Sequence, residues 1–149
     1  MPLLGDTFPE EYKKNFAKAN VEVGSVIKIY DHAAKKEKWH LIVGFDGGKY
    51  LAASVRINSE VNTKCILPEL LPYQVYITKK DFPFLKHDSY VNCAEVLIRA
   101  VEDFENHMKS SVDALKGCIQ SLRKLDEIRA MIATCPVILE KHKKKFGLL

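Results

Sequence analysis

The stretch that decides the fold is residues 38–59, KWHLIVGFDGGKYLAASVRINS, which has the pattern of a single β-hairpin. An apolar run, LIVGF at residues 41–45, precedes the sequence DGG at residues 46–48. A tight hairpin turn needs positive φ angles, which glycine adopts without strain. From residue 49 onward, polar and apolar side chains alternate with the period of two that is typical of a half-buried strand. The predicted core-facing positions of this second strand are Leu51, Ala53, Val55 and Ile57.

We expect a polar cluster at the open end of this hairpin. His40 lies near the start of the first strand, whereas Arg56, Asn58 and Ser59 lie near the end of the second. Antiparallel pairing brings these two ends together, so the register itself predicts the cluster. Each residue also has a plainer structural interpretation. His40 could donate to a backbone carbonyl, Arg56 could form a cross-strand ion pair, and the last two residues could belong to a turn.

The composition is that of an ordinary globular protein: 149 residues, 47% hydrophobic and 28% charged. No apolar run approaches the roughly 20 residues of a membrane span, and the N-terminus lacks a secretory signal pattern. The four cysteines are widely spaced without a C-x-x-C pair, which argues against zinc and for reduced thiols. A net charge of +4 permits an anionic partner without requiring one. We expect a cytoplasmic protein with no membrane contact, metal or cofactor.

Outside the hairpin, the first part of the chain predicts mainly β structure. A capping box, TFPE at residues 7–10, predicts a short helix over about 9–19. After the hairpin, Pro68 and Pro72 preclude a regular central strand and indicate a long loop. Three further extended segments are predicted, at residues 26–30, 74–78 and 84–91.

From about residue 93, the pattern changes to apolar residues recurring at intervals of three and four, as in amphipathic helices. One helix is predicted around residues 96–108, and Gly117 interrupts the pattern. A second helix is predicted around residues 122–132, and a third from Pro136 to near Gly147.

Short strands with few helices between them favour antiparallel pairing over parallel crossovers. We therefore predict an α+β fold, a small antiparallel SH3-like β-barrel with helices closing one side. The whole chain, residues 1–149, is predicted to be one domain. Its barrel core would span about 21–92 and its helical extension about 93–149.

Three further features have competing interpretations. His87, Asp88 and Ser89 are the residue types of a hydrolytic triad, but neighbours in an extended segment point to opposite faces. Trp39 could stack on a base or pack against the barrel. The basic run at residues 141–145 is typical of a solvated face and could also touch RNA.

Three segments, spanning about residues 23–98, resemble the PemK/MazF toxin family, whose fold is a compact SH3-like barrel with helices. Residues 23–27, VGSVI, resemble the glycine-led first strand of that family. Residues 38–43, KWHLIV, follow a basic loop and resemble its K/R-R-P-V-x-V strand. Residues 85–91, LKHDSYV, resemble its late L-x-x-x-S-x-V strand.

The resemblance implies a metal-independent endoribonuclease that cleaves single-stranded RNA, is neutralised by an antitoxin protein and forms a homodimer. The family's important Ser or Thr falls on Ser59, its strand-2 Arg falls on or beside Trp39, and its Pro becomes His40. The chemistry needs a proton acceptor for the ribose 2′-OH, a proton donor for the leaving oxygen and a cation for the phosphorane. The expected catalytic residues are His40, Arg56 and Ser59, and the expected substrate-binding residues are Lys38, Trp39 and Asn58.

The alternative is a non-catalytic member of the same fold that binds nucleic acid or a protein partner, as the related CcdB-like proteins bind gyrase. Loss of the family's strand-2 Arg favours this alternative. The combination of His40, Arg56 and Ser59 at one end of the hairpin favours cleavage. Geometry distinguishes the two: side chains of His40 and Ser59 that lie far apart or point into the core would weaken the case for cleavage sharply.

Overall fold

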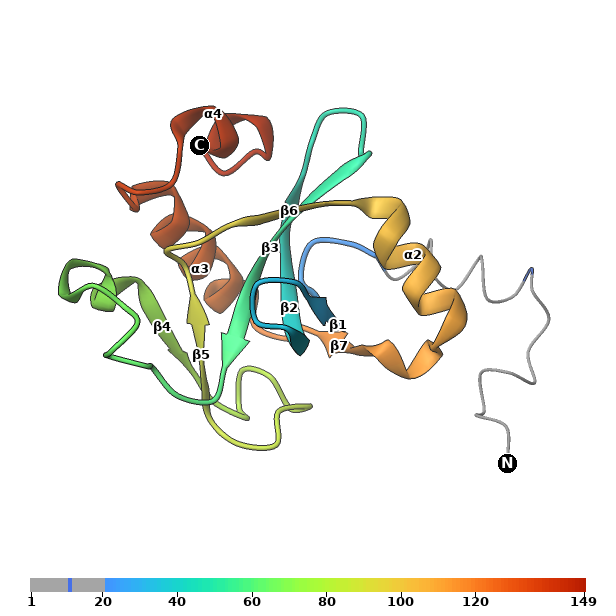
Figure 1. The fold of residues 1–149 in the computed structure, drawn as a ribbon, viewed down its shortest axis with the longest axis horizontal. Helices are drawn as coiled ribbons and strands as arrows, with labels where there is room; N and C mark the ends of the chain where they lie inside the picture. Colours follow the sequence, from blue (N-terminus) through green and yellow to red (C-terminus); the bar gives the residue numbers. More distant parts are fainter. Residues whose placement is uncertain (1–10, 12–20) are drawn as a thin grey trace.

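The computed structural model describes Glu11 and residues 21–149, and this part of the chain has an α+β fold built on one antiparallel sheet (Figure 1). The seven strands described are β1 (Ser25–Asp31), β2 (Lys36–Phe45), β3 (Leu51–Asn58), β4 (Gln74–Ile77), β5 (Ser89–Asn92), β6 (Leu97–Ala100) and β7 (Leu115–Cys118). The helices described are the α-helices α2 (Val101–Ser110), α3 (Leu122–Thr134) and α4 (Glu140–Lys145), and the 3-10 helices η2 (Pro68–Tyr73) and η3 (Val112–Ala114). The helix predicted over about 9–19 lies outside the described residues.

The central hairpin forms where the sequence predicts it, but the positive φ of its turn, +58°, falls on Lys49 and not on Gly47 or Gly48. β2 and β3 pair antiparallel, with Trp39 opposite Ile57 and His40 opposite Arg56. The Asp46 carboxylate holds the turn, because its Oδ1 atom accepts hydrogen bonds from the backbone N–H groups that follow the turn, at 2.8 and 2.9 Å. The hairpin is also the centre of the sheet, whose strand order is β4-β5-β3-β2-β1-β7 with β6 paired to β3.

Both faces of the hairpin are covered by helices. Helix α3 packs on one face through Leu125, Ile128 and Ile132, in the same core as Val55 of β3. Helix α2 covers the other face with an apolar side that packs against Ile27, Ile42 and Ala52. The sequence predicts that β3 is half-buried, but Ala52 and Ser54 on its predicted polar face are as buried as the core-facing Ala53 and Val55. A strand covered on both faces buries its short polar side chains too.

The sheet is open, which differs from the closed barrel that we predicted. Its order runs from β4 to β7, and no ladder joins these two strands in the part of the chain that the structure describes. The apolar side of α3 lies in the same core as Val75 and Ile77 of β4 and Ile119, which follows β7. A helix rather than a further strand pairing therefore fills the core between the two edges.

The prediction of an all-helical segment from about residue 93 is wrong. Residues 97–100, predicted to start a helix, form β6 and pair with residues 51–54 of β3. Strand β7 pairs with β1, so this segment supplies two strands of the sheet. The reason is tertiary: the outer edges of β3 and β1 offer unpaired backbone N–H and C=O groups, and a four-residue extended segment can satisfy them.

The remaining elements follow the predictions more closely. Helix α3 forms where predicted, with the Ser121 hydroxyl accepting a hydrogen bond from the Lys124 backbone N–H at 3.1 Å. The chain ends its last helix, α4, just before Gly147, whose φ of +69° suits glycine. The extended segment predicted over 84–91 is a strand only from Ser89, because residues 84–88 form turns and bends.

Replacement of Gly44 by alanine is expected to lower the free energy of unfolding by about 1–3 kcal/mol. A Cβ atom at this position of β2 would lie 2.4 Å from the backbone oxygen of Phe146, so strand and C-terminal segment must separate. Urea unfolding measures the change. The matched control is Gly47→Ala in the hairpin turn, where a Cβ atom meets nothing within 4 Å. Equal stability of the two variants would contradict this packing.

Candidate functional site

Polar residues at the open end of the hairpin lie on both sides of the sheet and fall into two pockets. His40 and Arg56 face one side, whereas their neighbours Trp39 and Ile57 face the other. The larger pocket, of about 300 Å³, is here called the basic pocket, and its lining residues are Lys36, Glu37, Lys38, Trp39, Ile57, Asn58, Ser59, Leu85, Lys86, His87 and Ser89. A second pocket, of about 240 Å³, is lined by Asp31, His32, Ala33, His40, Ser54, Arg56, Leu97, Ile98 and Arg99.

A buried cluster of Asp31, His40, Ser54 and Arg56 forms the floor of the second pocket. The Asp31 Oδ1 atom accepts hydrogen bonds from the backbone N–H groups of residues 33 and 34, at 3.1 and 3.0 Å. The Arg56 guanidinium grips the same carboxylate with two nitrogens, Nε at 2.5 Å and Nη2 at 3.1 Å. His40 Nε2 lies 3.1 Å from Asp31 Oδ2. One carboxylate therefore joins the β1–β2 turn to β2 and β3.

His40 is a neutral imidazole whose two nitrogens are both engaged. A carboxylate oxygen only accepts, so Nε2 carries the proton and Nδ1 accepts from the Ser54 hydroxyl at 3.4 Å. Burial lowers the pKa of His40 to about 4, and the charge of Asp31 opposes this shift only in part. The residue is 2% exposed. At neutral pH, His40 is therefore a structural group and not a proton carrier open to solvent.

Arg56 bridges two carboxylates of unequal burial. Its Nη1 atom donates to Glu95 Oε2 at 2.7 Å, and its side-chain bonds to Asp31 are the largest cause that raises the pKa of Arg56. Burial alone would raise the pKa of Asp31, but hydrogen bonds from Arg56 and the Ala34 N–H, with the charge of Arg56, hold it well below its usual range. Asp31 and Arg56 thus form a permanently charged pair.

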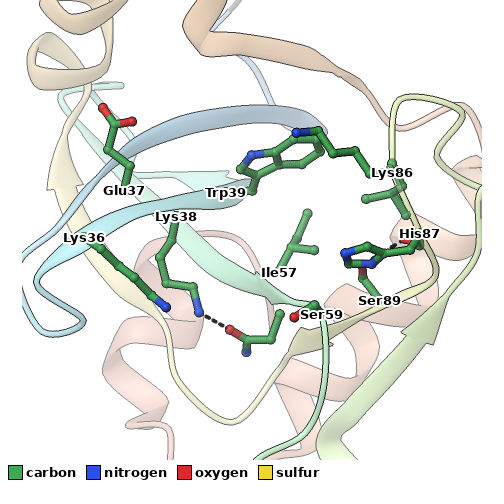
Figure 2. Close-up of a pocket in the computed structure, with 11 residues that line it drawn as sticks. Lys36, Glu37, Lys38, Trp39, Ile57, Ser59, Lys86, His87 and Ser89 are labelled. Atoms are coloured by element: carbon green, nitrogen blue, oxygen red, sulfur yellow. Dashed lines mark hydrogen bonds between the residues drawn. The ribbon is translucent and has the colours of Figure 1, made fainter.

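The basic pocket has the opposite character, because it is open and rich in cations (Figure 2). Lys36, Lys38 and Lys86 line it against one acidic residue, Glu37. The Glu37 carboxylate already has a partner, the Lys28 ammonium at 3.5 Å. The pocket therefore carries excess positive charge, which favours an anionic ligand.

Lys38 is a pocket lysine whose pKa is lowered. Burial lowers its pKa first, and the nearby charges of Lys36 and Arg56 lower it further, whereas Asp31 opposes them. The Lys38 ammonium donates a hydrogen bond to the Asn58 side-chain oxygen, across the open end of the hairpin. A bound anion would relieve the repulsion between these cations.

His87 enters the pocket from the loop between β4 and β5, with its ring directed toward Ile57 and Ser59 (Figure 2). Its Nδ1 atom lies 3.1 Å from the backbone oxygen of Asp88 and 3.4 Å from Ser89 Oγ. The Asp88 carboxylate does not contact the imidazole: it accepts from the Tyr76 hydroxyl at 2.7 Å. The three residues therefore do not form a hydrolytic triad.

The six expected site residues divide between the two pockets. Four of them line the basic pocket: Lys38, Trp39, Asn58 and Ser59. His40 and Arg56 pair as the register predicts, but they lie in the buried cluster. Ser59 follows the last residue of β3 and opens onto the basic pocket, so the structure does not bring His40 and Ser59 into one site.

Trp39 lies between the basic pocket and the packed residues behind it. It lines the basic pocket, yet its ring also packs against Phe84, with 6.0 Å between the ring centroids. The Lys116 ammonium lies 5.8 Å from the indole centroid. The indole therefore forms a wall of the pocket that is held from behind.

The segment that leads into β5 contributes residues to this pocket that were not among the expected site residues. Lys86, His87 and Ser89 come from a segment that pairs with the hairpin only through the end of β3. A signal was present, since the spacing of His87 and Ser89 by two residues places them on the same side of an extended chain. The sequence alone does not indicate that this side faces Ser59.

The described residues show neither a metal-binding group nor a membrane-spanning helix. They contain no group of three or more His, Cys, Asp or Glu side chains placed to hold a metal ion. No helix among them has both the length and the apolar character needed to cross a bilayer. The four cysteines, Cys65, Cys93, Cys118 and Cys135, are free thiols.

The chain matches no model of a known protein family, and no curated protein matches its sequence.

Asp31→Asn is expected to lower the free energy of unfolding by about 3–5 kcal/mol, because it leaves the Arg56 guanidinium without its buried counter-charge. The matched control is Glu95→Gln, which removes the other carboxylate of Arg56. The Glu95 side chain is 51% exposed, against 3% for Asp31, so its loss should cost at most about 1 kcal/mol. Denaturant unfolding of both variants measures the difference. Similar losses would mean that burial does not set the strength of these pairs.

The burial of neutral His40 also predicts a pH dependence of stability. An unfolded imidazole binds its proton near pH 6.5, whereas folded His40 binds it only near pH 4. Between these values the unfolded chain holds more protons, so stability falls as the pH falls. The contribution of His40 should drop by about 1.6 kcal/mol from pH 6.5 to 5. The measurement is urea unfolding across this range.

In this series, His40→Gln should flatten the dependence relative to the unchanged protein, because glutamine does not titrate. The control is His32→Gln, since the exposed His32 lies one residue after Asp31 but outside the buried cluster. If His40→Gln kept the full slope, another group would be responsible for it.

Proposed function

We propose that this chain is a metal-independent endoribonuclease that binds single-stranded RNA in the basic pocket and acts as the toxin of a toxin–antitoxin pair. One observation carries the proposal. Four of the six residues expected from the family resemblance line a single open pocket, together with two further lysines and an imidazole: Lys38, Trp39, Asn58, Ser59, Lys36, Lys86 and His87. On this proposal, the open antiparallel sheet is a variant of the SH3-like barrel.

The cations of the pocket support binding of the RNA backbone. Lys36 and Lys38 come from β2, and Lys86 comes from the opposite wall, so a phosphate between them meets positive charge from two sides. The lowered pKa of Lys38 reflects like-charge repulsion from Lys36 and Arg56 as well as burial. A phosphate would neutralise this repulsion, which makes binding more favourable than at an isolated surface lysine.

The other lining groups suit a single-stranded RNA. Bases are accessible for stacking only where the strand is unpaired, and the Trp39 indole forms an aromatic wall of the pocket. The Ser59 and Ser89 hydroxyls and the Asn58 amide can bond sugar or base edges. The free thiols are compatible with action in the cytoplasm. An antitoxin and a second copy of the chain are its proposed protein partners.

The second candidate is binding of RNA without cleavage. The burial of His40 outside the basic pocket favours it, because the residue expected to exchange protons with the RNA is sealed from the pocket. The candidates share a binding site and differ only in whether another pocket group moves the proton. One experiment can therefore address both.

Lys38→Ala combined with Lys86→Ala is expected to weaken binding of an unstructured RNA and to reduce its salt dependence. Each phosphate contact on a single strand contributes about 0.7 to the slope of log K against log salt, so the slope should fall by about 1.4. Fluorescence anisotropy with a labelled oligonucleotide at several salt concentrations measures it. The matched control, Lys141→Ala with Lys145→Ala, removes two exposed lysines of the C-terminal region.

In the same samples, incubation in EDTA and analysis of the ends tests cleavage. Discrete products from the unchanged protein that end in 2′,3′-cyclic phosphate support the ribonuclease. Binding with no products would select the second candidate. If both double variants weakened binding equally, the basic pocket would not be the RNA site.

A further inference from the structure

We propose that His87 is the catalytic base of the basic pocket, accepting the proton of the RNA 2′-OH at its Nε2 atom. This inference rests on the proposed ribonuclease function and assigns to His87 the role that the sequence suggested for His40. It is carried by the hydrogen bonds of the His87 ring and by the position of that ring in the pocket.

The hydrogen bonds of His87 fix which nitrogen carries the proton. Nδ1 lies 3.1 Å from the backbone oxygen of Asp88, and a carbonyl oxygen only accepts. Nδ1 must therefore carry the proton, and in the neutral ring Nε2 holds the lone pair. The Ser89 hydroxyl fits the same scheme. It donates to the His87 backbone oxygen at 3.1 Å and leaves its own oxygen facing Nδ1–H at 3.4 Å.

The ring is also held in place. Asp88 is anchored by the Tyr76 hydroxyl, which donates to Oδ2 at 2.7 Å, and by the Lys79 N–H, which donates to Oδ1 at 3.3 Å. Leu85, two residues before His87, is buried in the main core. A base that is oriented before the substrate binds needs no rearrangement during the reaction.

The basic lone pair of His87 opens onto the pocket that carries the phosphate-binding cations. The ring projects toward Ser59, across from Lys38 (Figure 2), and no hydrogen bond to Nε2 is found within the described part of the chain. His40 differs on both counts, since its two nitrogens contact Asp31 and Ser54 and it is 2% exposed. Of these two imidazoles of the hairpin region, only His87 can reach an RNA strand.

The reaction balances with the groups of this pocket. His87 Nε2 takes the proton of the 2′-OH as the 2′ oxygen forms a bond to the adjacent phosphorus. The bond from phosphorus to the 5′ oxygen breaks, and the departing oxygen takes a proton from a lysine ammonium of the pocket. The products are a 2′,3′-cyclic phosphate and a 5′-OH. The lysines also offset the negative charge that builds on the phosphorane oxygens.

The test is single-turnover cleavage of an unstructured RNA in EDTA by the unchanged protein, His87→Ala and His32→Ala. His87→Ala should cleave about 10²- to 10⁴-fold more slowly, which is the usual contribution of a positioned proton-transfer group. Its affinity for a 2′-O-methyl RNA, which binds but cannot react, should stay the same. His32→Ala, which removes an exposed imidazole outside the basic pocket, should cleave normally.

Two further readouts separate a base from a merely structural residue. The rate of the unchanged protein should fall on the acid side as the imidazole is protonated, and His87→Ala should lose this limb. Added free imidazole should restore part of the activity of His87→Ala and leave that of the unchanged protein unaffected.

The outcomes separate the two proposals. Normal cleavage by His87→Ala would overturn the role of His87 and leave the ribonuclease standing. A slow His87→Ala that also lost affinity for the 2′-O-methyl RNA and gained nothing from imidazole would overturn it too, in favour of a binding role. If the unchanged protein bound the 2′-O-methyl RNA and cleaved no RNA, the ribonuclease itself would be wrong, and the base with it.

Discussion

The arrangement of the hairpin region depends on the hydrogen bonds that the buried Asp31 carboxylate accepts. It accepts backbone hydrogen bonds from the β1–β2 turn, a two-nitrogen contact from Arg56 of β3 and the Nε2–H of His40 on β2. Arg56 extends the network to Glu95, just before β6. A charge buried at this depth is tolerated only when it is paired and fully hydrogen-bonded. The β1–β2 turn, His40 and Arg56 are therefore oriented by one side chain.

This network determines where a ligand can bind. His40 and Arg56 are used to satisfy Asp31, so they are withdrawn from solvent, although their residue types suit catalysis. Lys38 lies two residues before His40 on β2, and Asn58 lies two residues after Arg56 on β3. Their side chains form a hydrogen bond to each other in the lining of the basic pocket. The hairpin thus places structural ion pairs inside the fold and pocket-lining cations at its end. The buried ion pairs and the pocket lysines interact electrostatically, because the charge of Arg56 adds to burial in lowering the pKa of Lys38.

The sequence predicted those parts of the fold that depend on local patterns. Alternation and the DGG turn predicted the hairpin, and apolar spacing predicted α3. It failed for β6 and β7, because a four-residue strand is specified by the edge it pairs with and not by its own residues. The candidate site was likewise predicted only in part. Register correctly paired His40 with Arg56, but pairing alone does not tell a buried face from an open one.

The approach of His87 to Ser59 has a cause that lies further away in the chain. The short ladder between β3 and β5 joins residues 57–58 to residues 90–91, so the loop before β5 must return beside the end of β3. Leu85 enters the main core and Gly117 of β7 lies close to Phe84, where a Cβ atom would be 2.5 Å from the ring. Packing on both sides therefore brings this loop against the hairpin. With both sheet faces covered by helices, the end of the hairpin is where strand residues and a loop can together surround a ligand.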